Sequence, residues 1–271
     1  STIFKGIGRF MLRKENALHI NYKKLLIKWL SIADMVICSS AELKKTIERW
    51  NTNVIISLDY LQNETKFLKD DYAIDGKMKL VWEGQSVVFP SLLFFKDVFE
   101  AVNSFCELHI ITDEKFPALG GVLKKDVIVI IDQLPITTVF HKWELYNNYE
   151  KLSQFDCGII PLNSDNNFVW HKPANKLISF WFTALPTLVS NTPAYVEFMD
   201  AAGRKMYCGD TNEWIKKIKE LANMKAAERE AIAKNNLQFV RNNYSDEALD
   251  LIWHKVFEKL NNSSTPVSNE Q

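Results

Sequence analysis

Short apolar runs alternate along the chain with longer stretches whose apolar residues recur every three or four positions. The short runs predict strands at 35–38, 53–57, 80–82, 108–111, 127–131, 157–161, 187–189 and 205–208. The longer stretches predict helices at 23–30, 41–50, 90–104, 146–154, 172–182, 194–202, 212–223, 226–243 and 246–260. Several strands are almost wholly apolar, which is typical of parallel strands covered on both faces. The pattern predicts an α/β fold with a doubly wound parallel sheet.

The same pattern divides the chain into segments. Residues 1–58 read as the last part of a separate α/β unit, 59–78 as a linker without regular period, and 79–244 as a second unit. Residues 245–262 form a helix whose apolar face needs a packing partner, and the polar tail at 263–271 is predicted to be disordered. Because the chain begins with Ser1 rather than Met, we expect either a fragment of a longer protein or a segment prepared for expression.

Composition excludes several classes of partner and cofactor. The 33 basic and 33 acidic residues cancel, so no global field favours nucleic acid. The four cysteines are far apart and three lie in or beside predicted strands, which favours buried thiols in a reducing compartment rather than a metal site. No apolar run reaches the roughly 18 residues of a membrane span, so we expect a cytoplasmic protein. The basic amphipathic stretch at 23–29 is either a peripheral contact with the inner face of the membrane or a solvated surface helix.

Polar side chains gather where the strand at 157–161 ends and the next helix begins. Lys172 and Lys176 are four residues apart, and on the first turn of one helix they would share a face. A helix N-terminus flanked by two lysines suits a phosphate or diphosphate. The alternative is a solvated lysine pair. His171 and Asn175 beside them have either a ligand contact or a structural role.

Three stretches carry a resemblance to a known family. They are ADMVICSSAELKKTIERWNTNVIISLDYL at 33–61, LVWEGQ at 80–85, and the run from FDCGIIPL to KPANKLISFWFTALPTLVSNTPAY between 155 and 195. Taken in this order, they are similar to the C-terminal half of a GT-B glycosyltransferase, close to the retaining class called glycosyltransferase family 4. The third stretch is the most specific, and the likeness covers roughly residues 35–260.

The resemblance implies two Rossmann-like domains of the GT-B type, of which the chain holds mostly the C-terminal one. Residues 1–58 would then be a remnant of the N-terminal domain, and 79–244 the nucleotide-sugar-binding domain. Lys172 and Lys176 would bind the donor diphosphate. Many members carry two glutamates where this chain has His171 and Ser179, and a glycine where it has Ala184. A serine cannot accept from two ribose hydroxyls as a carboxylate does.

Further candidates follow from the same comparison. Gly84 after the strand at 80–82 would allow close approach to the diphosphate, and Glu83 and Gln85 beside it would contact the donor. Trp143, with Tyr146, would lie beside the nucleotide base, and Tyr195 would reach the sugar or phosphate. For each of these the alternative is ordinary packing.

Together these features predict a glycosyltransferase that moves a sugar from a nucleoside-diphosphate sugar to a glycan or lipid-linked acceptor, as in polysaccharide or cell-surface glycan synthesis. If the family rule holds, the reaction retains configuration, and no metal or other cofactor is expected, because lysines and a helix N-terminus supply positive charge. Two alternatives stay open. One is a nucleotide-sugar epimerase of the same fold, and the other is a non-catalytic nucleotide-sugar-binding module.

Overall fold

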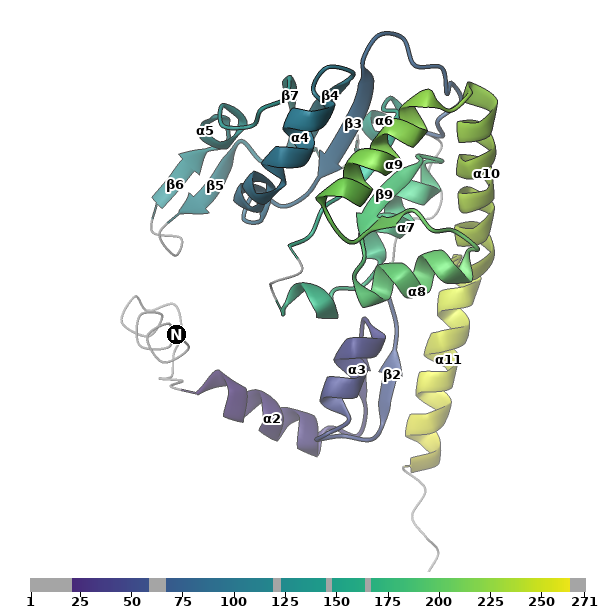
Figure 1. Cartoon of the computed structure of the whole chain (residues 1–271). Helices are drawn as coiled ribbons and strands as arrows, with labels where there is room; N and C mark the ends of the chain where they lie inside the picture. Colours follow the sequence, from purple (N-terminus) through teal and green to yellow (C-terminus); the bar gives the residue numbers. More distant parts are fainter. Residues whose placement is uncertain (1–20, 59–66, 119–122, 145–147, 164–166, 264–271) are drawn as a thin grey trace, which may run out of the picture. The chain divides into compact units, whose positions relative to one another are not determined.

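The computed structural model describes residues 21–58, 67–118, 123–144, 148–163 and 167–263 (Figure 1). The chain divides into two compact units. One comprises Ser1–Leu58 with Leu251–Gln271, and the other comprises Asp59–Asp250. None of the helices within the described ranges combines the length and apolar character needed to cross a membrane.

The smaller unit is a short parallel βαβ arrangement. Helix α2 (Tyr22–Ile32) is followed by β1 (Val36–Cys38), α3 (Ala41–Ile47) and β2 (Val54–Ile56), and β1 pairs in parallel with β2. A small core of Cys38, Ile47 and Val54 lies between them. The Asn51 side-chain amide donates to the carbonyls of Leu30 (2.8 Å) and Ala33 (2.7 Å), which fixes the end of α2. The unit also includes helix α11 (Asp246–Ser263) from Leu251 onward.

The larger unit contains a six-stranded parallel sheet in the order β10-β9-β8-β3-β4-β7. Its strands are β3 (Met78–Glu83), β4 (Cys106–Thr112), β7 (Thr138–Lys142), β8 (Cys157–Ile160), β9 (Thr187–Ser190) and β10 (Tyr207–Cys208). The chain builds outward from β3 in one direction and then, from β8, in the other. The strand order therefore reverses between β3 and β8, which is the topological switch point of a doubly wound sheet. This confirms the predicted fold class.

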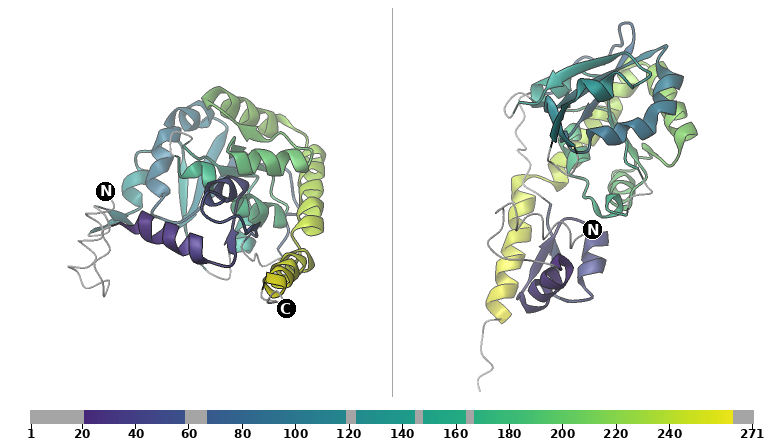
Figure 2. Two further views of the ribbon diagram at one scale, coloured as in Figure 1. Left: turned by 90° about the horizontal axis from the view of Figure 1, so that it is seen from below. Right: turned by 90° about the vertical axis from the view of Figure 1, so that its left-hand side faces the viewer.

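Helices cover both faces of this sheet (Figure 2). On one face η1 (Phe89–Phe95), α4 (Lys96–Val102), α5 (Ile128–Ile131) and α9 (Thr211–Asn223) enclose the main core around Leu80, Leu108 and Ile110. On the other, α7 (Asn175–Phe182) packs over Gly158 of β8. Ring contacts of 5.0 Å between Trp181 and Phe198 and 5.3 Å between Phe198 and Phe239 join α7 to α8 (Pro193–Ala201) and α10 (Ala226–Asn243). The unit also contains α6 (Asn148–Ser153) and η3 (Val169–His171).

The predicted strand at 127–131 is wrong, because Ile128–Ile131 forms α5. The Asp126 carboxylate accepts from the backbone N–H of Ile128 (3.1 Å) and starts a turn, and a short apolar run does not by itself distinguish a buried strand from a buried helix. The strand that continues the sheet is β7, which the sequence did not predict. An antiparallel hairpin of β5 (Lys115–Ala118) and β6 (Leu123–Asp126) was also missed.

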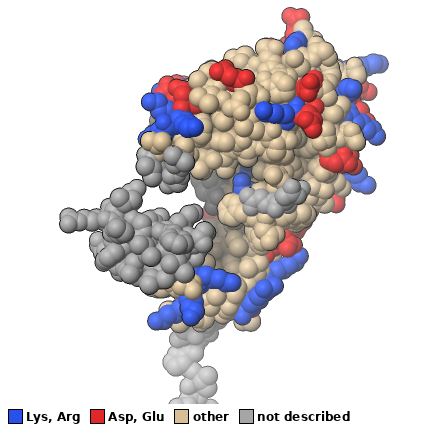
Figure 3. Space-filling model, turned by 60° about the vertical axis from the view of Figure 1, so that its left-hand side comes forward, with Lys and Arg blue, Asp and Glu red and all other residues tan. Residues whose placement is uncertain are grey.

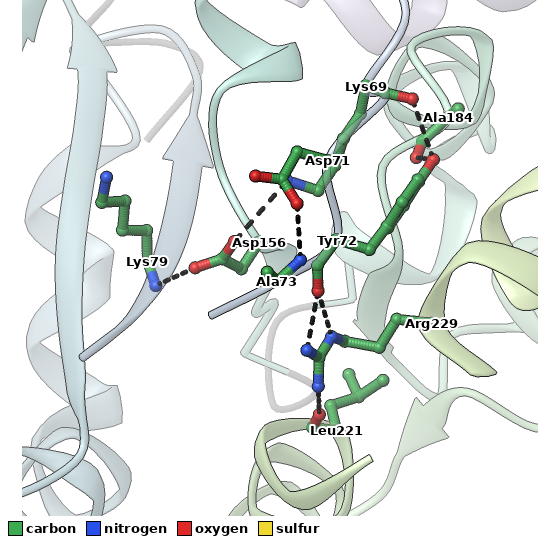
Figure 4. Close-up of polar contacts among 9 residues, drawn as sticks. All are labelled: Lys69, Asp71, Tyr72, Ala73, Lys79, Asp156, Ala184, Leu221 and Arg229. Atoms are coloured by element: carbon green, nitrogen blue, oxygen red, sulfur yellow. Dashed lines mark hydrogen bonds and ion pairs between the residues drawn. The ribbon is translucent and has the colours of Figure 1, made fainter. Parts of the chain in front are cut away.

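The predicted linker at 59–78 extends partly beyond the described residues, since 59–66 are not described. Residues 67–77 belong to the larger unit and are held against it by polar contacts (Figure 4). The Lys69 ammonium lies 3.5 Å from the Asp156 carboxylate, and both side chains are about nine-tenths buried. The Tyr72 hydroxyl donates to the carbonyl of Ala184 (2.9 Å). The Arg229 guanidinium donates to the Tyr72 carbonyl from Nε (3.0 Å) and Nη2 (2.7 Å).

Ala184 has a backbone φ of +57°, in the left-handed region that favours glycine. The resemblance found in the sequence led us to expect a glycine at this position, and the left-handed backbone suits that residue. Ala184 is 2% exposed, and the Tyr72 hydroxyl donates to the carbonyl of the same residue. Packing and the hydrogen bond therefore hold a conformation that costs an L-residue about 1–2 kcal/mol.

The substitution Arg229→Ala should lower the free energy of unfolding by about 2–4 kcal/mol, because it removes donors from the carbonyls of Tyr72, Leu221 and Met224, of which the first two are buried. Urea unfolding followed by tryptophan fluorescence measures this loss. Arg241→Ala, at an exposed position of the same helix, is the matched control and should change the free energy by no more than about 0.5 kcal/mol. Equal losses in the two variants would contradict the role of Arg229 in holding the 67–77 segment.

Candidate functional site

The candidate site lies at the carboxyl ends of β3 and β8, where the strand order reverses. Glu83 ends β3, and Lys176 is the second residue of α7, which follows β8 along the chain. The Lys176 ammonium donates to the Glu83 backbone carbonyl (2.6 Å) and to the Glu83 carboxylate (2.5 Å). Two residues predicted separately from sequence thus meet across the switch point, which is where ligands bind in open α/β sheets.

A glycine in β8 lets α7 lie close enough for this contact. A Cβ on Gly158 would overlap the ring of Phe180, which lies directly over β8. Lys176 precedes Phe180 by four residues, so both side chains lie on the same face of α7. The buried phenylalanine fixes the helix over the strand, and the lysine one turn earlier extends to the end of β3.

The sequence predicted that Lys172 lies on the helix at 172–182, but α7 begins only at Asn175. Pro173 follows Lys172, and the residue before a proline disfavours the helical conformation, so Lys172 is extended with φ −69° and ψ 140°. Its ammonium lies 5.8 Å from the centre of the Phe168 ring. Burial, and then the nearby charge of Lys176, lower the pKa of Lys172. Across the described residues, no carboxylate lies within ion-pair distance of Lys172, although Lys176 is paired.

Gly84 forms a turn that links the ends of three strands. Its N–H donates to the Ile111 carbonyl (3.1 Å), and its carbonyl accepts from the Thr112 hydroxyl (2.7 Å). The backbone carbonyl of Thr112 accepts in turn from the backbone N–H of Trp143 (2.9 Å). A Cβ on Gly84 would lie 2.7 and 2.8 Å from atoms of the Trp82 ring. The glycine is therefore required by the packing of Trp82 as well as by any close approach of a phosphate.

Ser179 and Tyr149 form a pair of hydroxyls beside Glu83. The Ser179 hydroxyl donates to the Asn175 carbonyl one turn earlier (3.0 Å), and Tyr149 of α6 lies close enough for Ser179 to influence the pKa of its hydroxyl. Burial raises the pKa of Tyr149, and the charge of Glu83 adds to this effect. Sequence reasoning missed Tyr149, because nothing local marks it, and only the fold brings α6 to this edge.

The other residues predicted for the site have the following positions in the structure. Asn175 is the first residue of α7 rather than its cap, and His171 ends η3 with its Nδ1 3.0 Å from the Asn167 carbonyl. Gln85 is exposed, and Trp143 is 37% exposed just after β7. Tyr195 is 3% exposed within α8, so its side chain is enclosed by protein. Tyr146 lies outside the described residues.

Among the cavities lined by described residues, two lie at opposite ends of the sheet strands. One of about 140 Å³ lies at the carboxyl ends of β8, β9 and β10, lined in part by Phe94, Asn163 and Asn191. The larger, of about 370 Å³, lies near the starts of β3 and β8. Its lining includes the carboxylates of Asp70, Asp71, Asp75 and Asp156 with the ammonium groups of Lys69 and Lys79. An excess of carboxylates disfavours a phosphate ligand, so size alone does not identify the donor site.

Charge elsewhere is mixed. Figure 3 shows acidic and basic side chains interspersed over the upper part of the face it draws, and mostly basic ones in its lower part. Within the described ranges, no group of three or more His, Cys, Asp or Glu side chains is arranged to hold a metal ion. The four cysteines are buried and free, as predicted, and burial raises the pKa of Cys106 and Cys208 to about 12.

No protein-family model matches the chain, and no curated protein matches it in sequence. Its structure is similar to that of TarM from S. aureus, with a TM-score of 0.61 and 12% identity over 90% of this chain and 48% of TarM. It is also similar to HepE from Anabaena, with a TM-score of 0.64 and 10% identity over 88% of this chain and 66% of HepE.

A third similar structure is an α,α-trehalose-phosphate synthase from Burkholderia vietnamiensis, with a TM-score of 0.61 and 12% identity. That match covers 90% of this chain and 64% of the synthase. The chain therefore spans about half of TarM and just under two thirds of the synthase. At these identities the likeness establishes the fold, which is that of the GT-B glycosyltransferases.

The substitution Gly158→Ala should destabilise the protein by about 1–3 kcal/mol, because its methyl group would displace Phe180 and with it α7. The same substitution in a Phe180→Leu background should cost less, since the smaller side chain leaves room. A double-mutant cycle in urea measures the coupling between the two positions. Strictly additive losses would mean that this contact does not fix the height of α7 over β8.

Proposed function

We propose that the chain belongs to a glycosyltransferase that takes a sugar from a nucleoside-diphosphate sugar and transfers it, with retention of configuration, to a glycan or lipid-linked acceptor. The observation that carries the proposal is the pair of lysines at the switch point of a GT-B-type sheet. Lys172 is half-buried without a carboxylate partner among the described residues, and Lys176 lies beside it. A buried cation lacking an anionic partner is stabilised when an anion binds.

The diphosphate of the donor fits this place. Sugar transfer breaks the bond between the sugar and the diphosphate, so negative charge accumulates on the leaving oxygen. Two fixed ammonium groups stabilise that charge without rearrangement during the reaction. In this proposal Lys172 and Lys176 bind the diphosphate as it leaves, and the chain needs no metal for that step.

We propose uridine as the donor base. The structure of TarM was obtained with UDP, that of HepE with UDP and glucose, and the trehalose-phosphate synthase is described as UDP-forming. Trp143 offers a partly exposed ring at the end of β7, connected through Thr112 to Gly84. Its position supports a nucleotide that runs along the carboxyl edge from β3 towards β7, with the base against the indole ring.

A lipid-linked acceptor would place the protein at a membrane surface. Helix α2 carries the lysines Lys23, Lys24 and Lys28, and its Leu26, Trp29 and Ile32 side chains are 58%, 62% and 63% exposed. A basic helix with an exposed tryptophan suits the interface of an anionic bilayer. We propose this helix as a peripheral membrane contact, and co-sedimentation with vesicles that contain anionic lipid tests it.

Calorimetric titration with UDP and UDP-sugars separates the proposed transferase from its alternatives. Binding with transfer to a glycan or lipid-linked acceptor supports the proposal. Binding without transfer in the full-length protein would favour a nucleotide-sugar-binding module, a reading motivated by His171 and Ser179 at positions where glutamates are common. Conversion of the free UDP-sugar without acceptor would favour an epimerase. Absence of any nucleotide binding by the folded protein would exclude all three.

Removal of either lysine should weaken UDP binding more than uridine binding. Lys172→Ala should raise the dissociation constant for UDP roughly tenfold, in line with the loss of a hydrogen bond to a charged group. Lys176→Ala should raise it at least as much, because it also leaves the Glu83 carboxylate without its partner. Lys234→Ala, on the exposed face of α10, is the control and should leave the constant unchanged. Equal effects on UDP and uridine would remove the lysines from the diphosphate site.

Binding should also depend on pH through Lys172. Burial and Lys176 lower its pKa, so as pH rises the ammonium loses its proton earlier than an ordinary lysine does. UDP affinity should therefore be complete near neutral pH and should fall as pH rises through the lowered pKa. Lys172→Arg should retain affinity at high pH, because a guanidinium stays charged. Titrations of both proteins between pH 7 and pH 10 test this, and identical pH profiles would contradict it.

A further inference from the structure

Glu83 is the only carboxylate in ion-pair contact with either lysine of the site among the residues that the structure describes. It contacts the Lys176 ammonium twice, through its carboxylate at 2.5 Å and through its backbone carbonyl at 2.6 Å. The two side chains are 21% and 30% exposed, so the pair lies at the surface of the site and is accessible to a ligand.

The two lysines therefore differ in whether an anion already contacts their ammonium group. Lys172 has only the ring of Phe168 as a described partner, whereas Lys176 already has an anion. A ligand with a single phosphate can contact Lys172 and leave the ion pair intact. A ligand with two phosphates that contacts both lysines must replace the Glu83 carboxylate at Lys176.

We propose that Glu83 is an exchangeable internal anion, which occupies the place of one donor phosphate at Lys176 and sets the affinity of the site for diphosphates. The inference rests on the proposed function, because it assigns the two lysines to the donor diphosphate. The backbone carbonyl of Glu83 makes the exchange feasible. It keeps the ammonium at the end of β3 when the carboxylate leaves, and Lys176 retains donors for a phosphate oxygen.

The exchange has a consequence for the reaction. A carboxylate that competes with phosphate for Lys176 weakens the binding of every diphosphate, including the nucleoside diphosphate that remains after transfer. Product release limits turnover in many enzymes, and an internal competitor shortens the lifetime of the product complex. Removal of the Glu83 charge should therefore strengthen diphosphate binding, whereas removal of a residue that binds the donor directly should weaken it.

Calorimetric titration of the full chain with inorganic pyrophosphate and inorganic phosphate tests whether removal of the Glu83 charge strengthens or weakens binding. Glu83→Gln keeps the side-chain shape and the backbone carbonyl but removes the charge. It should bind pyrophosphate about three- to tenfold more tightly than wild type, which corresponds to the energy of a partly exposed ion pair, while phosphate affinity should stay within about twofold. Glu230→Gln is the matched control, because its ion pair with Lys234 is also 2.5 Å long but lies on α10, and it should leave both affinities unchanged.

Weaker or unchanged pyrophosphate binding by a Glu83→Gln protein with wild-type thermal stability would overturn the inference. If that variant fails to fold, Glu83→Ala provides the same comparison, because it also retains the carbonyl and removes the charge. These probes are inorganic, so the result is separate from the proposed function. A wild-type protein that binds pyrophosphate but no UDP-sugar would contradict the proposed transferase activity. The change in pyrophosphate affinity of Glu83→Gln would still decide whether Glu83 competes with phosphate at Lys176.

Discussion

The contact between Lys176 and Glu83 is the interaction on which the candidate site depends. It joins the start of the helix after β8 to the end of β3, the two strands between which the order of the sheet reverses. A parallel sheet leaves its strand ends and helix starts at one edge, and this ion pair fixes their spacing there. The backbone carbonyl of Glu83 keeps the Lys176 ammonium at the end of β3 even when the carboxylate is displaced.

Close packing beneath the site holds that contact in place. Gly158 allows the ring of Phe180 to lie on the sheet, and Gly84 allows the ring of Trp82 to pack against the turn after β3. On the opposite side, Arg229 and Tyr72 hold the segment that leads into β3. The two glycines and the aromatic rings packed against them thus determine where the Lys176 ammonium meets Glu83.

The sequence predicted most of the sheet, because its central strands are continuous apolar runs, and it predicted that Glu83 and Lys176 belong to one site. It failed where a local pattern is ambiguous or overridden. The run at 127–131 reads as a strand but forms a helical turn, and Pro173 excludes Lys172 from the helix that its spacing suggested. Tyr149 could not be predicted, since only the tertiary structure brings it to Ser179. The GT-B fold is established, whereas donor, acceptor and mechanism are proposals.

A crystal structure of the protein with bound UDP tests the central claim most directly. The account predicts a diphosphate above the ends of β3 and β8, with the ammonium groups of Lys172 and Lys176 within hydrogen-bond distance of its oxygens and the Glu83 carboxylate displaced from Lys176. A diphosphate bound elsewhere, such as at the opposite edge beside Lys69 and Lys79, would contradict the account. So would a UDP complex in which the ion pair between Lys176 and Glu83 is intact and Lys172 makes no contact.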